Sequence, residues 1–132
     1  MQVLITVQDA APGNPPGVAG ADALLDARLD PRFGRAQGYL LCDTATGAVR
    51  RLDAASNMSL AQGAGIQAAQ AAADAGAEAV ITGHVGPKAF TALRRGGIAI
   101  YLSTHATARQ ALRALADGNL APAAEPDREG HW

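Results

Sequence analysis

The chain has 132 residues, almost half of them apolar, which fits one domain with a modest core of small aliphatic side chains. Its 11 basic and 12 acidic side chains give a formal net charge of −1, so charge gives no basis for binding DNA, RNA or an anionic membrane. The single cysteine, Cys42, excludes an internal disulfide, a structural zinc site with several thiolates and a four-cysteine iron–sulfur cluster.

The first half of the chain has a strand pattern interrupted by two loops. The predicted strands are residues 2–8, 38–43 and 48–53. The last two flank the turn TATG and form a hairpin. Residues 10–27, rich in Pro, Gly and Ala, predict a long loop with a helical turn near 21–27, and residues 29–36 predict a second loop.

The second half alternates helices with strands. Helices are expected over residues 62–75, 87–95 and 106–117, and strands over residues 77–82 and 98–102. Apolar spacing predicts that the first helix buries Ile66, Ala69 and Ala73, and that the third buries Ala108, Leu112 and Leu115. Ser103 or Thr104 is expected to cap the third helix. No apolar run reaches roughly 18 residues and no signal peptide is recognisable, so we expect a cytoplasmic protein.

The order β-β-β-α-β-α-β-α predicts an α/β fold. We expect a five-stranded mixed sheet of order 3-2-1-4-5, with the second strand antiparallel and helices on both faces, because parallel strands are joined by right-handed helical crossovers. A single domain over residues 1–118 would carry this sheet, and residues 119–132 would form a polar tail.

Ligands of such sheets bind at the carboxyl ends of the central strands. The topology gathers basic side chains, glycines and helix N-termini at this edge, which suits a compact anion. The predicted binding residues are Arg32, Phe33, Gly34, Arg35, Gly63, Gly65, His84, Val85, Gly86, Lys88 and His105. Their alternative roles are structural: Arg32 and Arg35 as surface partners of Asp30 or Asp26, His84 as an exposed turn residue and the glycines as turn residues.

Several segments carry a family resemblance in combination. DPRFGRAQGYLLCDTATG, GAGIQAAQ and VITGHVGPKAFTALRRGGIAIY resemble the dinitrogenase iron–molybdenum cofactor biosynthesis family. This group contains NifX, NafY, the C-terminal part of NifB and stand-alone proteins of the molybdenum–copper orange protein branch. The resemblance implies a three-layer α/β/α ribonuclease-H-like fold and non-catalytic storage or carriage of a metal–sulfur cluster. It also implies donor and acceptor proteins as partners.

The implied cargo is a molybdenum–copper sulfide or an iron–molybdenum cofactor precursor. Such an anion needs positive charge and N–H donors more than protein thiolates, so we expect it to be held mainly non-covalently, without direct metal ligands from the chain. Many relatives carry His where this chain has Arg32, which favours charge pairing over metal ligation in that loop. Cys42 is expected to be a small buried residue of the second strand.

Two other classes of function were weighed. A ribonuclease-H-like nuclease needs several converging carboxylates, and here Asp9 ends the first strand while residues 77–82 lead into Gly83 and His84 with no carboxylate. We therefore expect no enzymatic activity. A binding module for a phosphorylated or other small anionic ligand, or a protein-interaction module without a cluster, remains the alternative.

Overall fold

The structure is a computed structural model. It describes residues 1–8, 25–33, 38–53, 64–120 and 122–123. Asp9 and most of the expected loop 10–27 lie outside these ranges, so the helical turn predicted near residues 21–27 is described only from Leu25 onward.

Five strands form one mixed sheet in the order β3-β2-β1-β4-β5. The strands are β1 (Gln2–Val7), β2 (Gly38–Asp43), β3 (Val49–Asp53), β4 (Ala79–Thr82) and β5 (Ala99–Leu102). β2 is antiparallel to both β1 and β3, whereas β4 is parallel to both β1 and β5. The predicted strand order and direction are confirmed.

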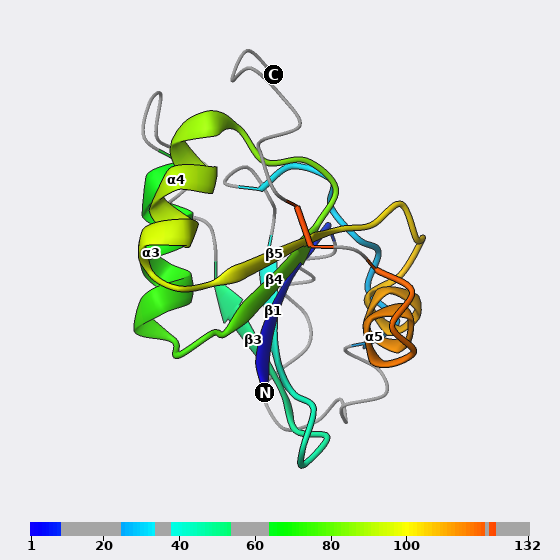
Figure 1. Ribbon diagram of the computed structural model, residues 1–132. Coiled ribbons are helices and arrows are strands. Elements are labelled where there is room, and N and C mark those ends of the chain that lie inside the picture. The colour runs from blue at the N-terminus through cyan, green and yellow to red at the C-terminus, as the bar shows by residue number, and fades with distance from the viewer. Residues whose placement is uncertain (9–24, 34–37, 54–63, 121, 124–132) are drawn as a thin grey trace.

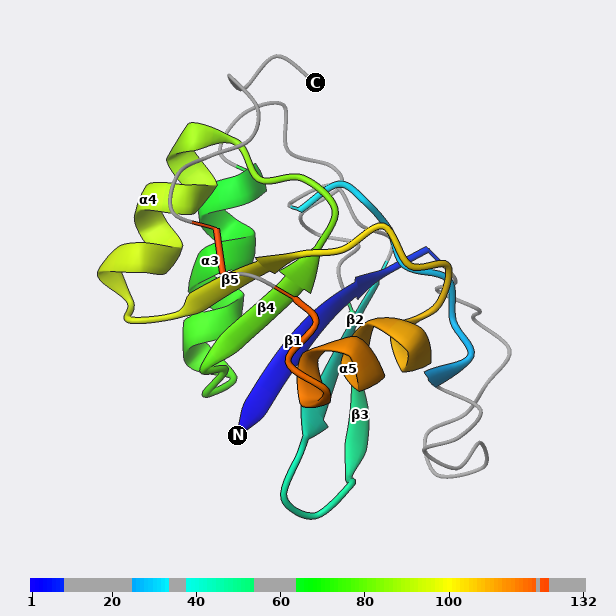
Figure 2. The same ribbon diagram turned by 45° about the vertical axis from the view of Figure 1, so that its right-hand side comes forward.

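In the described part of the chain, three helices cover the two faces of this sheet. They are α3 (Ala64–Asp74), α4 (Pro87–Arg95) and α5 (Ala108–Ala116). α3 and α4 lie together on one face and α5 lies on the other, which gives the expected three layers (Figures 1 and 2). Within the described part of the chain, no helix is long and apolar enough to cross a membrane.

The core consists of two apolar clusters separated by the sheet. Successive side chains of a strand point to opposite faces. In β1, Val3, Ile5 and Val7 accordingly join the cluster beneath α5, and Leu4 joins the cluster beneath α3 and α4. All four are essentially inaccessible to solvent, so β1 is buried on both faces, as expected for the central strand of a three-layer fold.

The buried face of α3 differs from the predicted one. Ala68, Ala69 and Ala72 are buried, whereas Ile66 is 45% exposed and Ala73 is exposed. α3 packs along α4 as well as on the sheet, and small alanines allow that close approach. Of the three residues at helical spacing, Ala69 faces inward as predicted, whereas Ile66 and Ala73 do not.

The buried face of α5 was also predicted only in part. Ala108, as predicted, is buried, but the other buried positions are Ala111 and Ala114. Leu112 and Leu115 are only partly buried, at the margin of the cluster beneath α5. A row of alanines brings the helix close to the sheet, and the longer leucines then cover its sides.

The start of α5 corrects another expectation. Its N-cap is Thr107, whose hydroxyl accepts a hydrogen bond from Gln110 N at 3.3 Å, rather than Ser103 or Thr104. The residues on both sides of this cap pair with residues 27–29: Leu29 N donates to Ala106 O, and Ala108 N, at the first position of α5, donates to Ala27 O. Because of this pairing, the helix begins only at the end of the stretch that pairs with the segment near residue 28.

The chain continues to pack beyond α5. Ala123 N donates to Ile100 O at 2.7 Å, Pro122 forms an isolated bridge with Tyr101, and Leu120 packs against the cluster beneath α5. Part of the segment expected as a polar tail thus lies along β5. The division between domain and tail at residue 118 stays a prediction.

We expect Thr107→Ala to lower the free energy of unfolding by about 1 kcal/mol, because the first turn of α5 loses its side-chain acceptor. Thr104→Ala is the matched control, since Thr104 is exposed and lies outside the cap. Urea denaturation measures both. An equal loss in the two variants would contradict the assignment of Thr107 as the cap.

Candidate functional site

One short segment joins the loops at the carboxyl edge of the sheet. We call residues 27–33 the crossing segment. It passes the ends of β1 and β4 and the start of α5, and is drawn in light blue in Figure 2. Its backbone hydrogen bonds to other segments are Gln8 N to Arg28 O (2.8 Å), Asp30 N to Thr6 O (2.8 Å), His84 N to Pro31 O (2.6 Å), Phe33 N to His84 O (3.3 Å), Leu29 N to Ala106 O (3.0 Å) and Ala108 N to Ala27 O (2.9 Å).

Gly83 allows the crossing segment to lie directly on the end of β4. A Cβ atom added at Gly83 would lie 2.6 Å from both Cα and Cβ of Pro31. Such distances are sterically forbidden, and neither partner is the free end of a flexible side chain. Gly83 is therefore required for close backbone approach, and not merely for a turn.

Buried polar groups at the ends of β1 and β4 hold the crossing segment in place. The Thr6 hydroxyl donates to Asp30 O at 2.5 Å and also hydrogen-bonds to the Thr82 hydroxyl at 2.9 Å. Asp30 is fully buried. One of its carboxylate oxygens, Oδ1, accepts hydrogen bonds from Arg32 N at 3.0 Å and Arg32 Nε at 3.3 Å.

Two predicted binding residues lie side by side above these buried polar groups. Arg32 and His84 form a parallel backbone bridge, which brings residues from distant parts of the sequence into register. The Arg32 side chain is 51% exposed even though its Nε contacts Asp30, and His84 is partly exposed. The pairing of Arg32 with Asp30, weighed from the sequence as an alternative to binding, is present, and it leaves the guanidinium accessible.

The helix α4 begins at Pro87, three residues after His84. Its N-cap, Gly86, provides no side-chain cap, and Pro87 has no N–H to offer. The first N–H groups of a helix lack intrahelical partners, and here they belong to Lys88 and Ala89. This end of α4 can therefore donate hydrogen bonds to an anion, with a favourable dipole.

His105 lies in the β5–α5 loop at the same edge and is held by Ser103. Ser103 Oγ lies 2.7 Å from His105 Nδ1 and accepts a hydrogen bond from His105 N at 3.1 Å. Ser103 is buried, whereas His105 is exposed. When the serine hydroxyl donates to Nδ1, the neutral imidazole carries its proton on Nε2 and can donate it to a ligand.

A known protein family matches most of this chain. The sequence profile of the family described as "Dinitrogenase iron-molybdenum cofactor" matches residues 16–118. The chain belongs to this family. The match includes the crossing segment, both His84 and His105, and all of α3, α4 and α5, so the resemblance inferred from the motifs is confirmed.

Two solved structures share this fold over nearly their whole length. The apo form of the orange protein from Desulfovibrio gigas is 39% identical, with a TM-score of 0.82 and 96% of each chain covered. An NMR structure of a Thermotoga protein proposed to be NifB is 26% identical, with a TM-score of 0.75 and 98% of each chain covered. An uncharacterized protein of Methanocaldococcus jannaschii is 25% identical over 95 residues, which is 70% of this chain and 80% of the relative.

Other residues predicted for the family site face elsewhere. Phe33 and Val85 are buried in the cluster beneath α3 and α4, where they anchor the crossing segment and the β4–α4 loop. Lys88 is exposed and lines an open groove on α4 together with Ile66 and Arg95. The structure thus brings Arg32 and His84 together, and places Lys88 on the outer side of the helix layer.

Three of the predicted site residues, Gly34, Arg35 and Gly63, lie outside the described residues, and Gly65 is described only as part of the first turn of α3. Sequence reasoning missed Thr6, Thr82 and Ser103, and considered Asp30 only as an ion-pair partner. A usable signal was present: Thr6 and Thr82 are polar residues at the carboxyl ends of otherwise apolar strands.

The described groups at the carboxyl edge are hydrogen-bond donors and a positive charge, which suit an anion. Among them, no group of three or more His, Cys, Asp or Glu side chains is arranged to hold a metal. The groups at the edge are instead a guanidinium, imidazoles and helix N–H donors. A sulfide-covered cluster presents acceptors that such donors can contact.

Cys42 lies far from this edge. It pairs with Val3 at the start of β1, whereas Val7 marks the carboxyl end, about 13 Å away at the rise of a strand. Cys42 is buried beneath α5, and burial raises the pKa of its thiol to about 11. The expected buried role is confirmed, and the thiol is protonated at neutral pH, which disfavours both metal ligation and nucleophilic attack.

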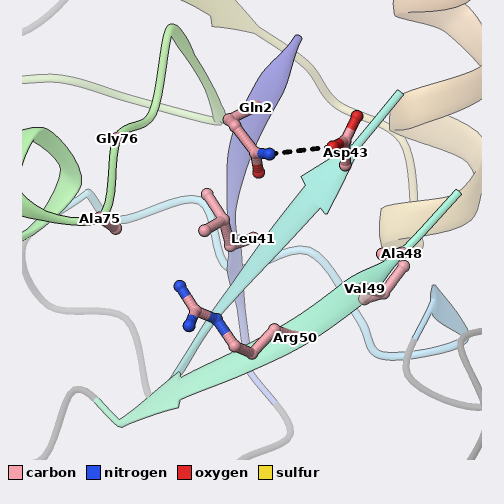
Figure 3. A pocket seen from close by; sticks show the side chains of 8 residues that line it. All are labelled: Gln2, Leu41, Asp43, Ala48, Val49, Arg50, Ala75 and Gly76. Carbon is pink, nitrogen blue, oxygen red and sulfur yellow. Dashed lines mark hydrogen bonds between the residues drawn. The ribbon is translucent and has the colours of Figure 1, made fainter. Parts of the chain in front are cut away.

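A separate hollow of about 320 Å³ opens at the opposite, amino edge of the sheet (Figure 3). Gln2 Nε2 donates to Asp43 Oδ2 at 3.0 Å on its wall, and Arg50 extends from β3 beside Leu41. The N–H of Ala45 is the main cause that lowers the pKa of Asp43. A fixed carboxylate beside a single arginine makes this hollow a poorer anion site than the carboxyl edge.

We expect Gly83→Ala to lower the free energy of unfolding by about 1–3 kcal/mol, because the new methyl group must displace the Pro31 backbone. Gly96→Ala is the matched control: its Cβ would meet Leu93 O at an ordinary 3.5 Å. Urea denaturation of both variants measures the difference. A Gly83 variant as stable as the Gly96 variant would show that the crossing segment does not need this close approach.

The raised pKa of Cys42 predicts a pH effect on stability. Because the native thiol keeps its proton up to about pH 11 while the unfolded thiol loses it near pH 9.0, stability is lost as pH rises across this window. We expect the unfolding free energy to fall between pH 8.5 and 10.5 by up to about 2 kcal/mol more in the wild type than in Cys42→Ala. Identical slopes in the two proteins would contradict this.

Proposed function

We propose that this protein binds an anionic metal–sulfur cluster at the carboxyl edge of its sheet, and stores or carries it without catalysing a reaction. The proposed cargo is a molybdenum–copper sulfide or a precursor of the iron–molybdenum cofactor. Membership of the dinitrogenase iron-molybdenum cofactor family supports a cluster-related role, and the similarity to the orange protein favours the small stand-alone branch. Donor and acceptor proteins are the proposed partners.

The observation that carries the proposal is the placement of Arg32 beside His84, next to the uncapped start of α4. A guanidinium supplies several N–H donors and a permanent positive charge. Helix N–H groups and imidazole N–H groups donate directional hydrogen bonds to the anion. They do not bind the metal, so no metal–protein bond has to be broken on release. The proposed site extends over other residues predicted at this edge, namely Gly34, Arg35, Gly63, Gly65 and His105, whereas Lys88 on the outer side of α4 is not part of it.

The binding mode also suits a carrier. Metal–thiolate bonds from the protein would have to be exchanged at each transfer, whereas hydrogen bonds and charge pairs break without changing the cluster's own ligands. The same donors would accept phosphate, which is the alternative cargo. A direct comparison of the two anions therefore belongs in the test.

We expect anaerobic titration with tetrathiomolybdate and copper(I) to give a protein-bound visible absorption band at low salt, and inorganic phosphate not to displace it. Arg32→Gln should weaken binding about tenfold, because a charge-assisted hydrogen bond is lost. Arg113→Gln is the control, since Arg113 is exposed in the last turn of α5 on the opposite layer.

Gel filtration followed by metal analysis separates bound from free cluster in this experiment. Failure of the wild type to retain molybdenum, or displacement by phosphate at equal concentration, would overturn the proposed cargo. Equal affinity of the Arg32 and Arg113 variants would remove Arg32 from the site.

A further inference from the structure

We propose that Asp30 is a positioning residue that competes with the cargo for Arg32, and so sets how readily the cargo is released. The inference rests on the proposed function and deepens it, because it concerns the control of affinity at the same site.

In the described part of the chain, only one of the two carboxylate oxygens of Asp30 accepts hydrogen bonds. Oδ1 accepts two hydrogen bonds from Arg32, from the backbone N and from Nε. Oδ2 is buried and has no hydrogen-bond partner among the residues that the structure describes. Nearly all buried polar atoms in proteins have a hydrogen-bond partner, and burying a carboxylate oxygen without one lowers the stability of the fold. A hydrogen bond to Oδ2 from a nearby donor would therefore be favourable.

Arg32 can supply that donor, but only by turning away from a ligand. In the structure the guanidinium is held through Nε, and the side chain remains 51% exposed. Arginine and carboxylate also form a two-bond arrangement in which both oxygens are engaged. In that arrangement a second guanidinium N–H would reach Oδ2, and fewer N–H groups would be directed towards an anion in solvent.

Asp30 itself is fixed, so the adjustable partner is Arg32. The backbone of Asp30 is held on both sides, since its N donates to Thr6 O and its carbonyl accepts from the Thr6 hydroxyl. The buried carboxylate thus offers a constant competing acceptor next to the site. A bound anion must keep its hydrogen bonds to the guanidinium of Arg32 in competition with the carboxylate of Asp30. When the anion leaves, the guanidinium returns to that carboxylate.

The test is Asp30→Asn, which keeps a side-chain oxygen for the two Arg32 N–H groups and removes the negative charge. We expect the dissociation constant for the tetrathiomolybdate–copper(I) mixture to fall about tenfold and release to slow by a similar factor. Asp74→Asn is the control: it removes one negative charge from α3, where Asp74 pairs with Gln70 instead of a site residue.

The double variant Asp30→Asn with Arg32→Gln shows whether the effect passes through Arg32. We expect most of the gain in affinity to disappear, because no guanidinium remains to compete for. A gain that persists in the Arg32→Gln background would mean simple charge repulsion and would overturn the inference. Unchanged or weaker binding by Asp30→Asn alone would overturn it as well.

A measurement on the unchanged protein covers the case in which Asp30→Asn does not fold. In NMR spectra of the guanidinium groups, adding the same mixture should shift the Arg32 Nη resonances strongly while the backbone amide of Asp30 stays in place. Unmoved Nη resonances in a protein that binds molybdenum would refute the role of Asp30 and leave the proposed function standing. Absence of binding by the wild type would instead refute the proposed function.

Discussion

The close contact between Pro31 and Gly83 is the constraint on which the carboxyl edge depends. Because a side chain at position 83 is sterically excluded, the crossing segment can lie directly on the end of β4. This contact places Arg32 in register with His84, although the two lie about fifty residues apart in the sequence. The same segment pairs with the loops that follow β1 and precede α5, so one stretch of chain organises several neighbouring loops.

The buried polar groups next to this contact position the crossing segment and do not themselves form a binding surface. Thr6 and Thr82 lie at or near the carboxyl ends of two central strands. The Thr6 hydroxyl holds the carbonyl of Asp30, and the Thr82 hydroxyl bonds to that of Thr6. A buried aspartate is expensive unless it is matched, and here the match is incomplete. Retaining such a group next to a cationic side chain is understandable if binding must be reversible.

The topology could be predicted from the sequence because its signals were local and redundant. Pro87 at the start of α4, the glycines after the helices and the β-branched residues of β1 each mark an element, and the strand order follows from the handedness of the crossovers. The adjacency of Arg32 and His84 at one edge followed from topology too. The burial of Phe33 and Val85, and the outward direction of Lys88, did not, because sequence spacing does not show how a loop packs on a helix layer.

The pairing of Ala123 with Ile100 has a consequence for how the molecule behaves in a crowded solution. β5 ends the sheet on its side, and an exposed strand edge is a template for association with another chain. At this position the protein fills the edge with its own backbone, and Pro122 beside it carries no amide hydrogen with which to recruit a further strand. Pro122 and Ala123 therefore cover part of the β5 edge at which a strand of a second molecule could otherwise pair.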